Sequence, residues 1–344
     1  MTQHSSLSTQ SCNQPLRWLI TGGCGFIGTS LIRQLMQEGG HAIRVLDNLS
    51  VGTRDDLASV CDFEKVDTSL SSFTFPLSSS NSVELVVGDI LDDELAIKVT
   101  KGADVIVHLA ANTGVGPSVE DPRKDCVTNV IGTLNYLEGA RTNGVKRFIF
   151  ASSGAPVGEC TPPIHEELPA HPVSPYGASK LAGEGYCSAY YRSFGVETVA
   201  LRFGNVYGPG SGHKNSVVAK FIKQAMNGET LEVYGDGKQT RDFIYIEDLI
   251  RAIQLAATKE KVGGEVFQIA TNRETTVSEM LSELLKVMEE SGMPKPDVIH
   301  GEKRQGDVQR NFSDTRKAGL MLDWHAEMKL FEGLSLTADS FLQR

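Results

Sequence analysis

Residues 17–28 read RWLITGGCGFIG, in which an apolar run passes directly into a cluster of glycines and then into a helical pattern. Three of these glycines form a GxxGxxG pattern. Glycines are needed where a strand turns tightly into a helix and the backbone approaches a pyrophosphate, which the helix N-terminus attracts. The segment therefore predicts a dinucleotide-binding turn. The residues expected to contact the dinucleotide here are Gly22, Gly25, Phe26, Ile27 and Gly28.

The sequence that follows places this turn in a larger fold. From Arg17 onward, short β-rich runs alternate with helical patterns, which is typical of a parallel sheet with helices on both faces. The sequence therefore predicts an α/β protein built on a Rossmann-type, doubly wound parallel sheet. The strands are expected at RWLIT, AIRVL, ELVVG, ADVIVHLA, KRFIF and ETVALRF.

Three helices between these strands can be predicted from their ends or from their apolar spacing. The first begins near Phe26 and ends at Gly39 and Gly40, because glycine commonly terminates a helix. Another begins at SPYGASK, with Ser174 as N-cap and Pro175 at the first helical position. A further helix presents an apolar stripe at helical spacing, made of Val127, Val130, Ile131, Leu134 and Leu137.

After about Gly204 the chain becomes less regular, which predicts a smaller α/β lobe that closes over the carboxyl edge of the sheet, where ligands bind in such folds. A later helix begins with a capping box of Thr276 and Glu279. The Ser-rich residues 60–82 are interpreted as a surface insertion. The predicted division is a flexible tail at 1–14, a dinucleotide-binding domain at 15–203 plus about 241–262, and the smaller lobe at 204–240 plus 263–344.

Composition narrows the classes of function. The 344 residues allow one large or two medium domains, and the net charge of -10 argues against a nucleic-acid or anionic membrane surface. The six cysteines lie far apart, without a CxxC pair or a Cys/His cluster, so reduced thiols are expected rather than disulfides or a metal site. The polar start and the lack of a long apolar run indicate a cytoplasmic protein.

The end of the second strand indicates which dinucleotide is bound. Asp47 follows Gly28 by nineteen residues, where a carboxylate accepts both hydroxyls of an adenosine ribose and repels a 2'-phosphate. NAD is therefore favoured over NADP, although an acid that only caps a turn is the alternative. Asp89 follows the third strand and is expected near the adenine edge. The other residues expected to contact the cofactor are Asn48, Ile90, Leu109, Ala110, Ala111 and Asn129.

The segment YGASK places Tyr176 and Lys180 four residues apart, so both side chains share one face of a helix. A free tyrosine has a pKa of about 10, and a base at neutral pH needs a pKa about three units lower, or about 4 kcal/mol. A helix N-terminus supplies only about 0.3 to 1 kcal/mol. Most of the shift is therefore expected from Lys180 and from an oxidised nicotinamide that Lys180 would hold through its ribose.

Together these motifs resemble a known family. TGGCGFIG, HLAA, the strand-end serine, YGASK, LRFGNVYGPG and QTRDFIYIEDL are similar to the extended short-chain dehydrogenase/reductases, and within them to the NAD-dependent epimerase/dehydratase group that acts on nucleotide sugars. The resemblance covers nearly the whole chain from Arg17, apart from the Ser-rich insertion. It implies a Rossmann domain with tightly held NAD, a smaller lobe that binds the nucleotide sugar, and a homodimer built from the two long helices.

The loop after KRFIF distinguishes reactions within this family. The serine aligned with Ser153 hydrogen-bonds the reacting sugar hydroxyl in family members, and Ser152 is the next candidate. Family members that dehydrate resemble one another in an Asp-Glu pair after this residue, and uronate decarboxylases tend to carry a glutamate one residue further on. Gly154 and Ala155 stand at these positions and cannot move a proton. The resemblance therefore implies oxidation and re-reduction at one carbon.

The resemblance also assigns residues of the smaller lobe. Arg241 and Arg304 match the arginines that the family turns towards the diphosphate of the substrate, and Asn205 matches its phosphate-contacting asparagine. Asn311 falls where some hexose-only epimerases carry a tyrosine that narrows the sugar pocket. A smaller side chain at this position would leave room for an N-acetyl group.

The leading hypothesis is a UDP-sugar 4-epimerase that acts on a hexose, an N-acetylhexosamine or a uronic acid through a transient 4-keto intermediate. Its catalytic residues are predicted to be Ser153, Tyr176 and Lys180, with Tyr176 as the base and NAD as a prosthetic group. A decarboxylase or dehydratase that uses the same intermediate is an alternative. A non-catalytic NAD sensor is a second alternative, although such relatives generally lose the tyrosine or the lysine. No nucleic-acid, membrane or metal partner is expected.

Overall fold

The computed structural model of the chain describes residues 15–66, 75, 81–213, 216–302 and 309–343. The predicted tail at 1–14 lies outside these residues. An eight-stranded sheet forms the centre of the molecule, and all of its strand pairs are parallel. Its strands are β1 (Arg17–Thr21), β2 (Ala42–Asp47), β3 (Glu64–Lys65), β4 (Ser82–Val87), β5 (Val105–His108), β6 (Arg147–Ser153), β7 (Glu197–Phe203) and β12 (Glu265–Ile269).

The strand order across the sheet is β12-β7-β6-β5-β1-β2-β4-β3, so the chain runs outward from β1 first in one direction and then in the other. This order confirms the predicted doubly wound Rossmann-type sheet. The reversal between β1 and β5 opens a crevice at the carboxyl ends of these strands, which is where ligands bind in such sheets. The glycine-rich turn after β1 lies at this point.

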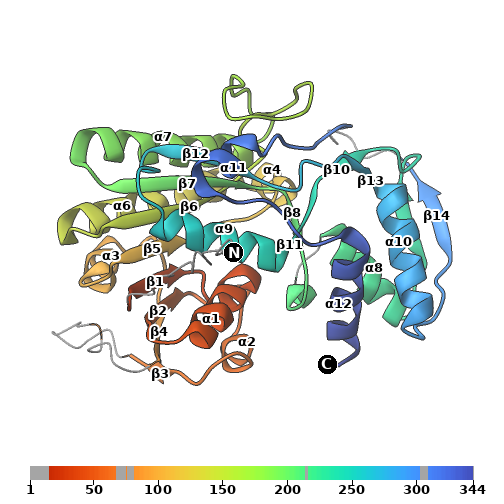
Figure 1. Ribbon diagram of the computed structural model, residues 1–344, viewed down its shortest axis with the longest axis horizontal. Coiled ribbons are helices and arrows are strands. Elements are labelled where there is room, and N and C mark those ends of the chain that lie inside the picture. Colours follow the sequence, from red (N-terminus) through yellow and green to blue (C-terminus); the bar gives the residue numbers. More distant parts are fainter. Residues whose placement is uncertain (1–14, 67–74, 76–80, 214–215, 303–308, 344) are drawn as a thin grey trace, which may run out of the picture.

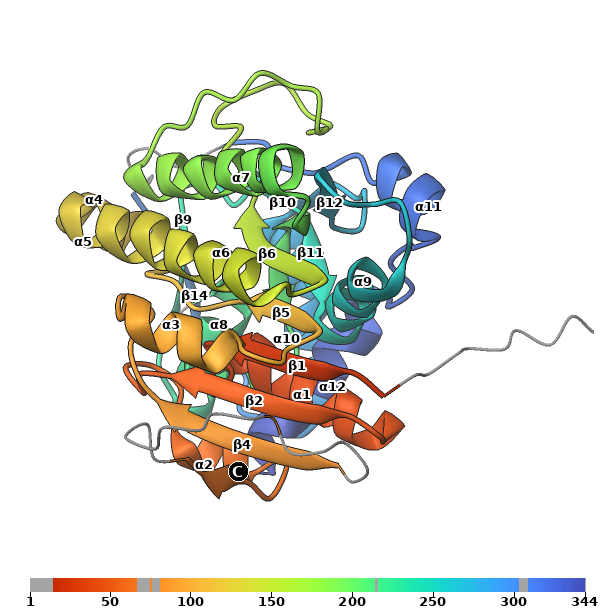
Figure 2. The same cartoon turned by 90° about the vertical axis from the view of Figure 1, so that its left-hand side faces the viewer.

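Helices cover both faces of the sheet, because successive strand residues point to opposite sides. On β1, Trp18 and Ile20 pack into one core together with α1 (Phe26–Glu38) and α9 (Ile246–Thr258). Leu19 packs into a second core on the other face. Figure 2 shows the helices of that second face side by side; they are α3 (Asp93–Thr100), α6 (Gly132–Asn143) and α7 (Pro175–Phe194).

The helix predicted around Val127 is longer and less regular than its apolar stripe suggests. It consists of α4 (Val115–Glu120), α5 (Pro122–Cys126), a π-helical turn η1 (Val127–Ile131) and α6. Val127 and Ile131, two members of the predicted apolar stripe, lie in the π-helical turn and are 37% and 44% exposed. The residues buried instead include Asn129, Thr133 and Tyr136.

A smaller group of elements stands beside the sheet (Figure 1). It contains three two-stranded sheets and three helices of eight residues or more. The predicted capping box at Thr276 and Glu279 is present at the start of its longest helix. The elements are β8 (Asn205–Tyr207), β9 (Leu231–Tyr234), β10 (Thr240–Arg241), β11 (Phe243–Tyr245), β13 (Thr275–Thr276), β14 (Val298–Gly301), α8 (Val217–Met226), α10 (Val277–Glu290) and α12 (Leu330–Leu342).

Two segments that the sequence division places in the smaller lobe lie against the large sheet instead. Strand β12 pairs with β7 along its whole length and buries Phe267 and Ile269, so it is the edge strand of the large sheet. Helix α11 (Arg316–Leu322) packs on β12 and α9. The predicted boundary at residue 263 is therefore wrong for these segments, because the chain returns to the sheet after its excursion. The assignment of the dinucleotide to the large sheet and of the nucleotide sugar to the smaller lobe stays a prediction.

The Ser-rich segment 60–82 is described only in part, since residues 67–74 and 76–80 lie outside the described ranges. Its β3 is a two-residue, exposed strand at the edge of the sheet. Phe75 is buried, and the Arg44 guanidinium lies 4.1 Å from the centre of its ring. A cation over an aromatic face is attracted by the ring. The segment is thus held to the sheet at one residue at least.

The close approach of α7 to the sheet can be tested at Gly183. A methyl group there would overlap the ring of Phe150, which is fully buried on β6. Gly183→Ala is therefore expected to lower the free energy of unfolding by about 1–3 kcal/mol, the usual effect of overpacking. Urea unfolding of the purified variant measures this change.

Gly185→Ala is the matched control on the same helix. Nothing lies within 4 Å of the added Cβ, and alanine favours a helix interior over glycine by about 0.5–1 kcal/mol. The control should be as stable as the parent or more stable. A Gly183→Ala variant as stable as Gly185→Ala would show that the contact between α7 and β6 is looser than described.

Candidate active site

The turn after β1 leaves no room for side chains. Gly22 has a φ of 69°, and a Cβ on it would lie 2.8 Å from the backbone nitrogen of Ala110. A Cβ on Gly28 would lie 2.5 Å from the Cα of Gly23. Gly25 is the N-cap of α1 and provides no capping side chain. The helix N-terminus is therefore open to an anion, and the turn fits a pyrophosphate closely.

Asp47 lies beside this turn at the end of β2. Its carboxylate accepts hydrogen bonds from the backbone N–H groups of Cys24 at 2.9 Å and Leu49 at 2.8 Å. Burial raises the pKa of this carboxyl group, and the two backbone hydrogen bonds act in the opposite direction. Each oxygen has a second lone pair, so the carboxylate retains the capacity to accept ribose hydroxyls. Asp47 therefore links the glycine turn to the predicted ribose position.

The other residues predicted to contact the cofactor surround the same crevice. The exposed Asn48 donates through its Nδ2 to Asp89, with a separation of 3.0 Å. Ile90 is buried against α6, where the lack of a side chain on Gly132 makes room for it. Leu109, Ala110 and Ala111 follow β5 and are partly buried, and the first two donate to Thr21. Phe26 and Ile27 begin α1 and are also partly buried.

Asn129 is held in a buried network of hydrogen bonds with neighbouring protein groups. Its Oδ1 accepts from the backbone N–H of Asn112 at 2.8 Å. Its Nδ2 lies 3.0 Å from the Asn112 carbonyl, 3.0 Å from Asp125 and 3.1 Å from the hydroxyl of Ser179. With 2% exposure, Asn129 ties the segment after β5 to α5 and α7.

The predicted chemical pair lies at the start of α7, which faces β6. Ser174 caps the helix by accepting from the N–H of Gly177 at 3.1 Å. Lys180 is 4% exposed, and its ammonium donates to the carbonyl of Ala151 at 2.8 Å. The Lys180 nitrogen lies 5.8 Å from the centre of the Tyr176 ring. Burial lowers the pKa of Lys180 to about 8, so the ammonium remains largely charged at neutral pH.

The phenol of Tyr176 is less acidic than a free tyrosine in the protein without cofactor. Burial raises its pKa to about 12, while a hydrogen bond from Ser153 acts in the opposite direction. The expectation that Lys180 and an oxidised nicotinamide together make the phenol acidic stays a prediction. Asp125 opposes ionisation of the phenol as well.

The two strand-end serines have different partners. Ser153 accepts a hydrogen bond from the N–H of Ala155 at 3.2 Å and is also bonded to Tyr176. Ser152 is 3% exposed and donates to Glu184 at 2.5 Å. Ser152 thus belongs to the interior, and the geometry distinguishes the first candidate hydroxyl from the second.

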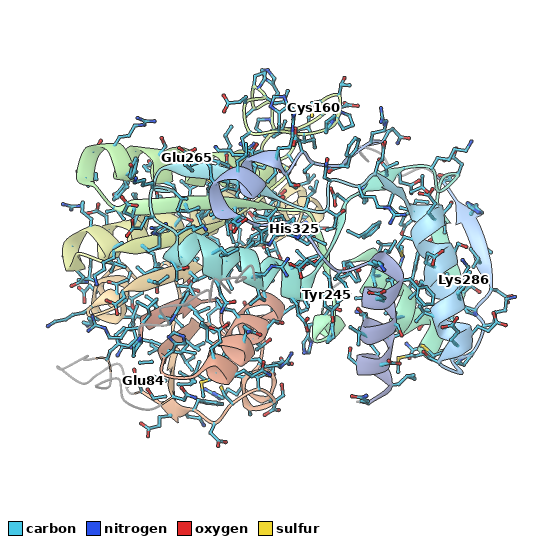
Figure 3. All side chains as sticks on the ribbon, viewed as in Figure 1. Glu84, Cys160, Tyr245, Glu265, Lys286 and His325 are labelled. Carbon is cyan, nitrogen blue, oxygen red and sulfur yellow. The ribbon has the colours of Figure 1, made fainter. Side chains whose placement is uncertain are left out.

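The loop between β6 and α7 follows these serines. At Gly154, nothing lies within 4 Å of the position of a Cβ, so a side chain there would have room. Glu166 accepts from the N–H of Gln268 on β12 at 2.7 Å and so fastens the loop to the sheet. Cys160 lies in the outer part of this loop, at the far side of the molecule from Glu84 (Figure 3).

The smaller lobe brings together three of the four residues predicted to bind substrate. Asn205 is exposed, and its N–H donates to the carbonyl of Asp242, next to Arg241. Arg241 is partly buried and donates to the Thr240 carbonyl at 2.7 Å. The N–H of Asn311 donates to the Thr240 hydroxyl at 3.1 Å. Arg304 lies outside the described residues.

Two buried carboxylates near Lys180 were not predicted from the sequence. Glu184 is one helical turn after Lys180 and forms an ion pair with Arg202 on β7. Asp125 on α5 is 0% exposed and bonded to Asn129. The sequence spacing could have indicated both residues. Glu184 follows Lys180 by four residues and Asn129 follows Asp125 by four, so each pair shares one helix face.

Other kinds of site are not found in the parts of the chain that are described. Among these residues, no group of three or more His, Cys, Asp or Glu side chains is placed to hold a metal ion. In the same residues, no helix has the length and apolar character needed to cross a bilayer. The cysteines within the described ranges, Cys24, Cys61, Cys126, Cys160 and Cys187, are all free thiols, and Cys12 lies outside these ranges.

Comparison with known proteins is consistent with this geometry. Residues 18–270 match the model of the NAD dependent epimerase/dehydratase family. A UDP-glucose 4-epimerase of Mycolicibacterium smegmatis is 33% identical over 331 residues, which cover 95% of this chain and 98% of that protein. The crystal structure of a UDP-glucose 4-epimerase from Thermotoga maritima with UDP-glucose has a TM-score of 0.83 and 34% identity, covering 95% of this chain and 99% of that one.

Other matches differ in their sugar or their reaction. A UDP-glucuronic acid 4-epimerase from Bacillus cereus, in complex with UDP-glucuronic acid and NAD, has a TM-score of 0.82 and 29% identity, covering 95% of this chain and 99% of that one. A UDP-N-acetylglucosamine 4-epimerase and dTDP-glucose 4,6-dehydratases also match. The fold is therefore shared by proteins that invert C4 and by proteins that dehydrate.

The different surroundings of the two serines lead to a paired prediction. Ser153→Ala removes a hydrogen bond that lowers the pKa of Tyr176, so the titration midpoint of the phenol should rise. Ser152→Ala removes a donor to Glu184 and should cost about 1 kcal/mol of stability while leaving the Tyr176 midpoint unchanged. NMR titration of [13C]tyrosine-labelled protein with NAD bound measures the midpoint, and urea unfolding measures stability. The reverse assignment of the two effects would contradict the geometry.

Proposed function

The chain belongs to the NAD-dependent epimerase/dehydratase family, and on this premise we propose that it is a UDP-sugar 4-epimerase with tightly bound NAD. The observation that carries the proposal is the group at the end of β6, where Ser153 is bonded to Tyr176 and Lys180 lies on the same helix face. The residues directly after Ser153 are Gly154 and Ala155, which supply no acid or base. The site thus offers one proton-transfer group and one hydroxyl.

The cofactor fits the residues at the crevice. The tight turn at Gly22 and the uncapped N-terminus of α1 suit the pyrophosphate, and Asp47 suits an adenosine ribose without a 2'-phosphate. When bound, NAD supplies a hydride acceptor that later returns the hydride, so no net oxidation takes place. Lys180 would hold the cofactor through its ribose.

In the proposed mechanism, Tyr176 exchanges a proton with the hydroxyl at C4 of the sugar. The phenolate takes the proton as C4 is oxidised. After the 4-keto sugar has rotated within the site, C4 is reduced from its other face and the phenol returns the proton. Ser153 orients the hydroxyl by hydrogen bonding. Because the pKa of Tyr176 is raised to about 12 in the protein alone, the phenol becomes a base only when positive charge is added beside it.

The smaller lobe is proposed to bind the UDP part of the substrate. Asn205 on β8 pairs with Phe243 on β11 and donates to the carbonyl of Asp242, which follows Arg241. Arg241 and Asn205 are proposed to contact the diphosphate, with Arg304 as a further cation. Asn311 is proposed to line the sugar pocket and to leave room for an N-acetyl group. A UDP-N-acetylglucosamine 4-epimerase among the structural matches supports this.

Turnover and its chemistry can be tested together by NMR in D2O. The purified protein is mixed with UDP-hexoses, UDP-N-acetylhexosamines and UDP-uronates in turn, without added cofactor. Inversion at C4 is expected with at least one of them, with no deuterium at C4 or C5, because the original hydride returns and no C5 proton is removed. Tyr176→Phe should lower the rate by about 10²–10⁴, the usual contribution of an acid-base group, while NAD stays bound.

Four results would count against these proposals. Deuterium at C5 with loss of water would identify a dehydratase, and release of carbon dioxide from a UDP-uronate would identify a decarboxylase. Reversible NAD binding without turnover of any sugar would identify a sensor. If UDP-N-acetyl sugars are neither substrates nor inhibitors, the role given to Asn311 is wrong.

We also propose that the protein is a homodimer formed by the helices on the α6 and α7 face. Val119 at 61%, Ile131 at 44% and Tyr186 at 39% exposure leave apolar surface on α4, η1 and α7. Such surface in a group is typical of an interface. Light scattering after size exclusion should therefore give twice the chain mass, and Ile131→Glu should give monomers. A parent protein that is monomeric at micromolar concentration contradicts the proposal.

A further inference from the structure

A buried carboxylate that has no assigned role lies beside the predicted chemical pair. Asp125 on α5 is 0% exposed. Its Oδ1 accepts from Asn129 at 3.0 Å, whereas its Oδ2 is buried and has no hydrogen-bond partner among the described residues. A buried ionised carboxylate is costly unless a cation compensates it. The position of this charge therefore calls for a positive partner nearby.

Lys180 is the cation that can compensate the charge of Asp125. Helix α5 packs against α7, and Asp125 acts electrostatically on Lys180 in the direction that favours the ammonium form. Lys180 itself is 4% exposed and donates to a single carbonyl, that of Ala151. A carbonyl accepts a hydrogen bond but carries no charge, so the ammonium also lacks full compensation.

The network around Asn129 fixes the two charged groups relative to each other. Asn129 donates to Asp125 and lies 3.1 Å from the hydroxyl of Ser179, which immediately precedes Lys180 on α7. Ser179 is in turn bonded to the carbonyl of Tyr176 at 3.0 Å. The carboxylate is thus tied to the helix turn that carries both members of the chemical pair.

Of the other ionisable groups that face Lys180, Glu184 also favours its ammonium form but already has a cationic partner, and the rest are uncharged. Glu184 on α7 accepts from Nε of Arg202 at 2.8 Å and from Nη2 at 2.7 Å, so its charge is compensated by a bidentate pair. His108 on β5 is held neutral, because burial lowers its pKa to about 3. The pKa of the buried Cys187 thiol is raised, so this group is uncharged.

We infer that Asp125 is the fixed counter-charge of Lys180, a positioning residue that keeps the ammonium charged in a buried site. The inference takes the roles of Tyr176 and Lys180 from the proposed function. The same carboxylate opposes ionisation of Tyr176, so it helps to keep the phenol neutral until positive charge from the cofactor is present. Asp125 thereby contributes to restricting base formation to the cofactor-bound site.

The inference predicts a coupled change in two titrations. Asp125→Asn keeps the shape and removes the charge, so the midpoints of Tyr176 and Lys180 should both fall. A nearby opposite charge usually shifts a pKa by about one unit or more, which is a tenfold change in the ratio of the two protonation states. NMR titration of NAD-saturated protein, labelled with [13C]tyrosine and [13C]lysine, measures both midpoints. Tyr176→Phe and Lys180→Met assign the signals.

Asp121→Asn is the matched control. Asp121 is exposed, caps α5 by accepting from the N–H of Lys124 at 2.9 Å, and can be replaced by asparagine, which caps equally well. The variant removes the same charge from the same helix, and both midpoints should stay where they are in the parent. Equal shifts in the two variants, or no shift in Asp125→Asn, would overturn the inference, because a structural role alone would not move the midpoints.

Loss of folding is also informative. If Asp125→Asn does not fold, the inference predicts that adding Lys180→Met restores folding, because the uncompensated ammonium is then removed. A double variant that also fails to fold contradicts the pairing. These readouts use no sugar substrate, so they can fail or succeed independently of the test for epimerisation.

Discussion

The burial of a lysine ammonium between a helix and the end of a strand is the constraint on which the rest of this site depends. Lys180 reaches the Ala151 carbonyl only because α7 lies close to β6, and Gly183 permits that approach by leaving space for Phe150. Capping of α7 by Ser174 sets where the helix begins. The same helix turn then presents Tyr176 to Ser153. The packing of α7 on β6 therefore determines how far Tyr176 and Lys180 lie from the end of β6.

Burial has opposite effects on the two members of the pair. It lowers the pKa of Lys180 and raises that of Tyr176, so it disfavours the charged form of each. The ammonium survives because carboxylates act on it, whereas the phenolate has no comparable support from the protein. On the proposed mechanism, the missing support comes with the oxidised cofactor, and it disappears once C4 of the sugar has been oxidised. The proton would then stay on Tyr176 until it is returned to the sugar.

Much of the fold can be predicted from the sequence, because local patterns carry it. Strand residues, the glycine turn after β1 and the caps at Ser174 and Thr276 are local features, and the structure has them where expected. The placement of β12 in the smaller lobe is wrong because the chain leaves the large sheet and returns to it much later, and the π-helical turn at Val127 leaves no mark in the apolar spacing.

The site divides in the same way. The candidate residues that follow motifs could be placed on their elements in advance, but their partners could not. Ser152 and Ser153 are adjacent residues of the same type. Because successive side chains of β6 point to opposite sides of the sheet, Ser152 contacts Glu184 and Ser153 contacts Tyr176. Asp125 lies on a helix that looks polar, and its burial appears only when α5 packs on α7. Packing between distant segments thus determines what the motifs leave open.

The most direct test of this account is the titration of the Tyr176 phenol in three states of the protein, free of cofactor, with NAD+ and with NADH. The account predicts a midpoint near 12 in the cofactor-free protein, a fall of about five units with NAD+ to the value of about 7 that a base needs at neutral pH, and no comparable fall with NADH. A phenol that is already acidic without cofactor, or one that NAD+ leaves unchanged, would contradict it.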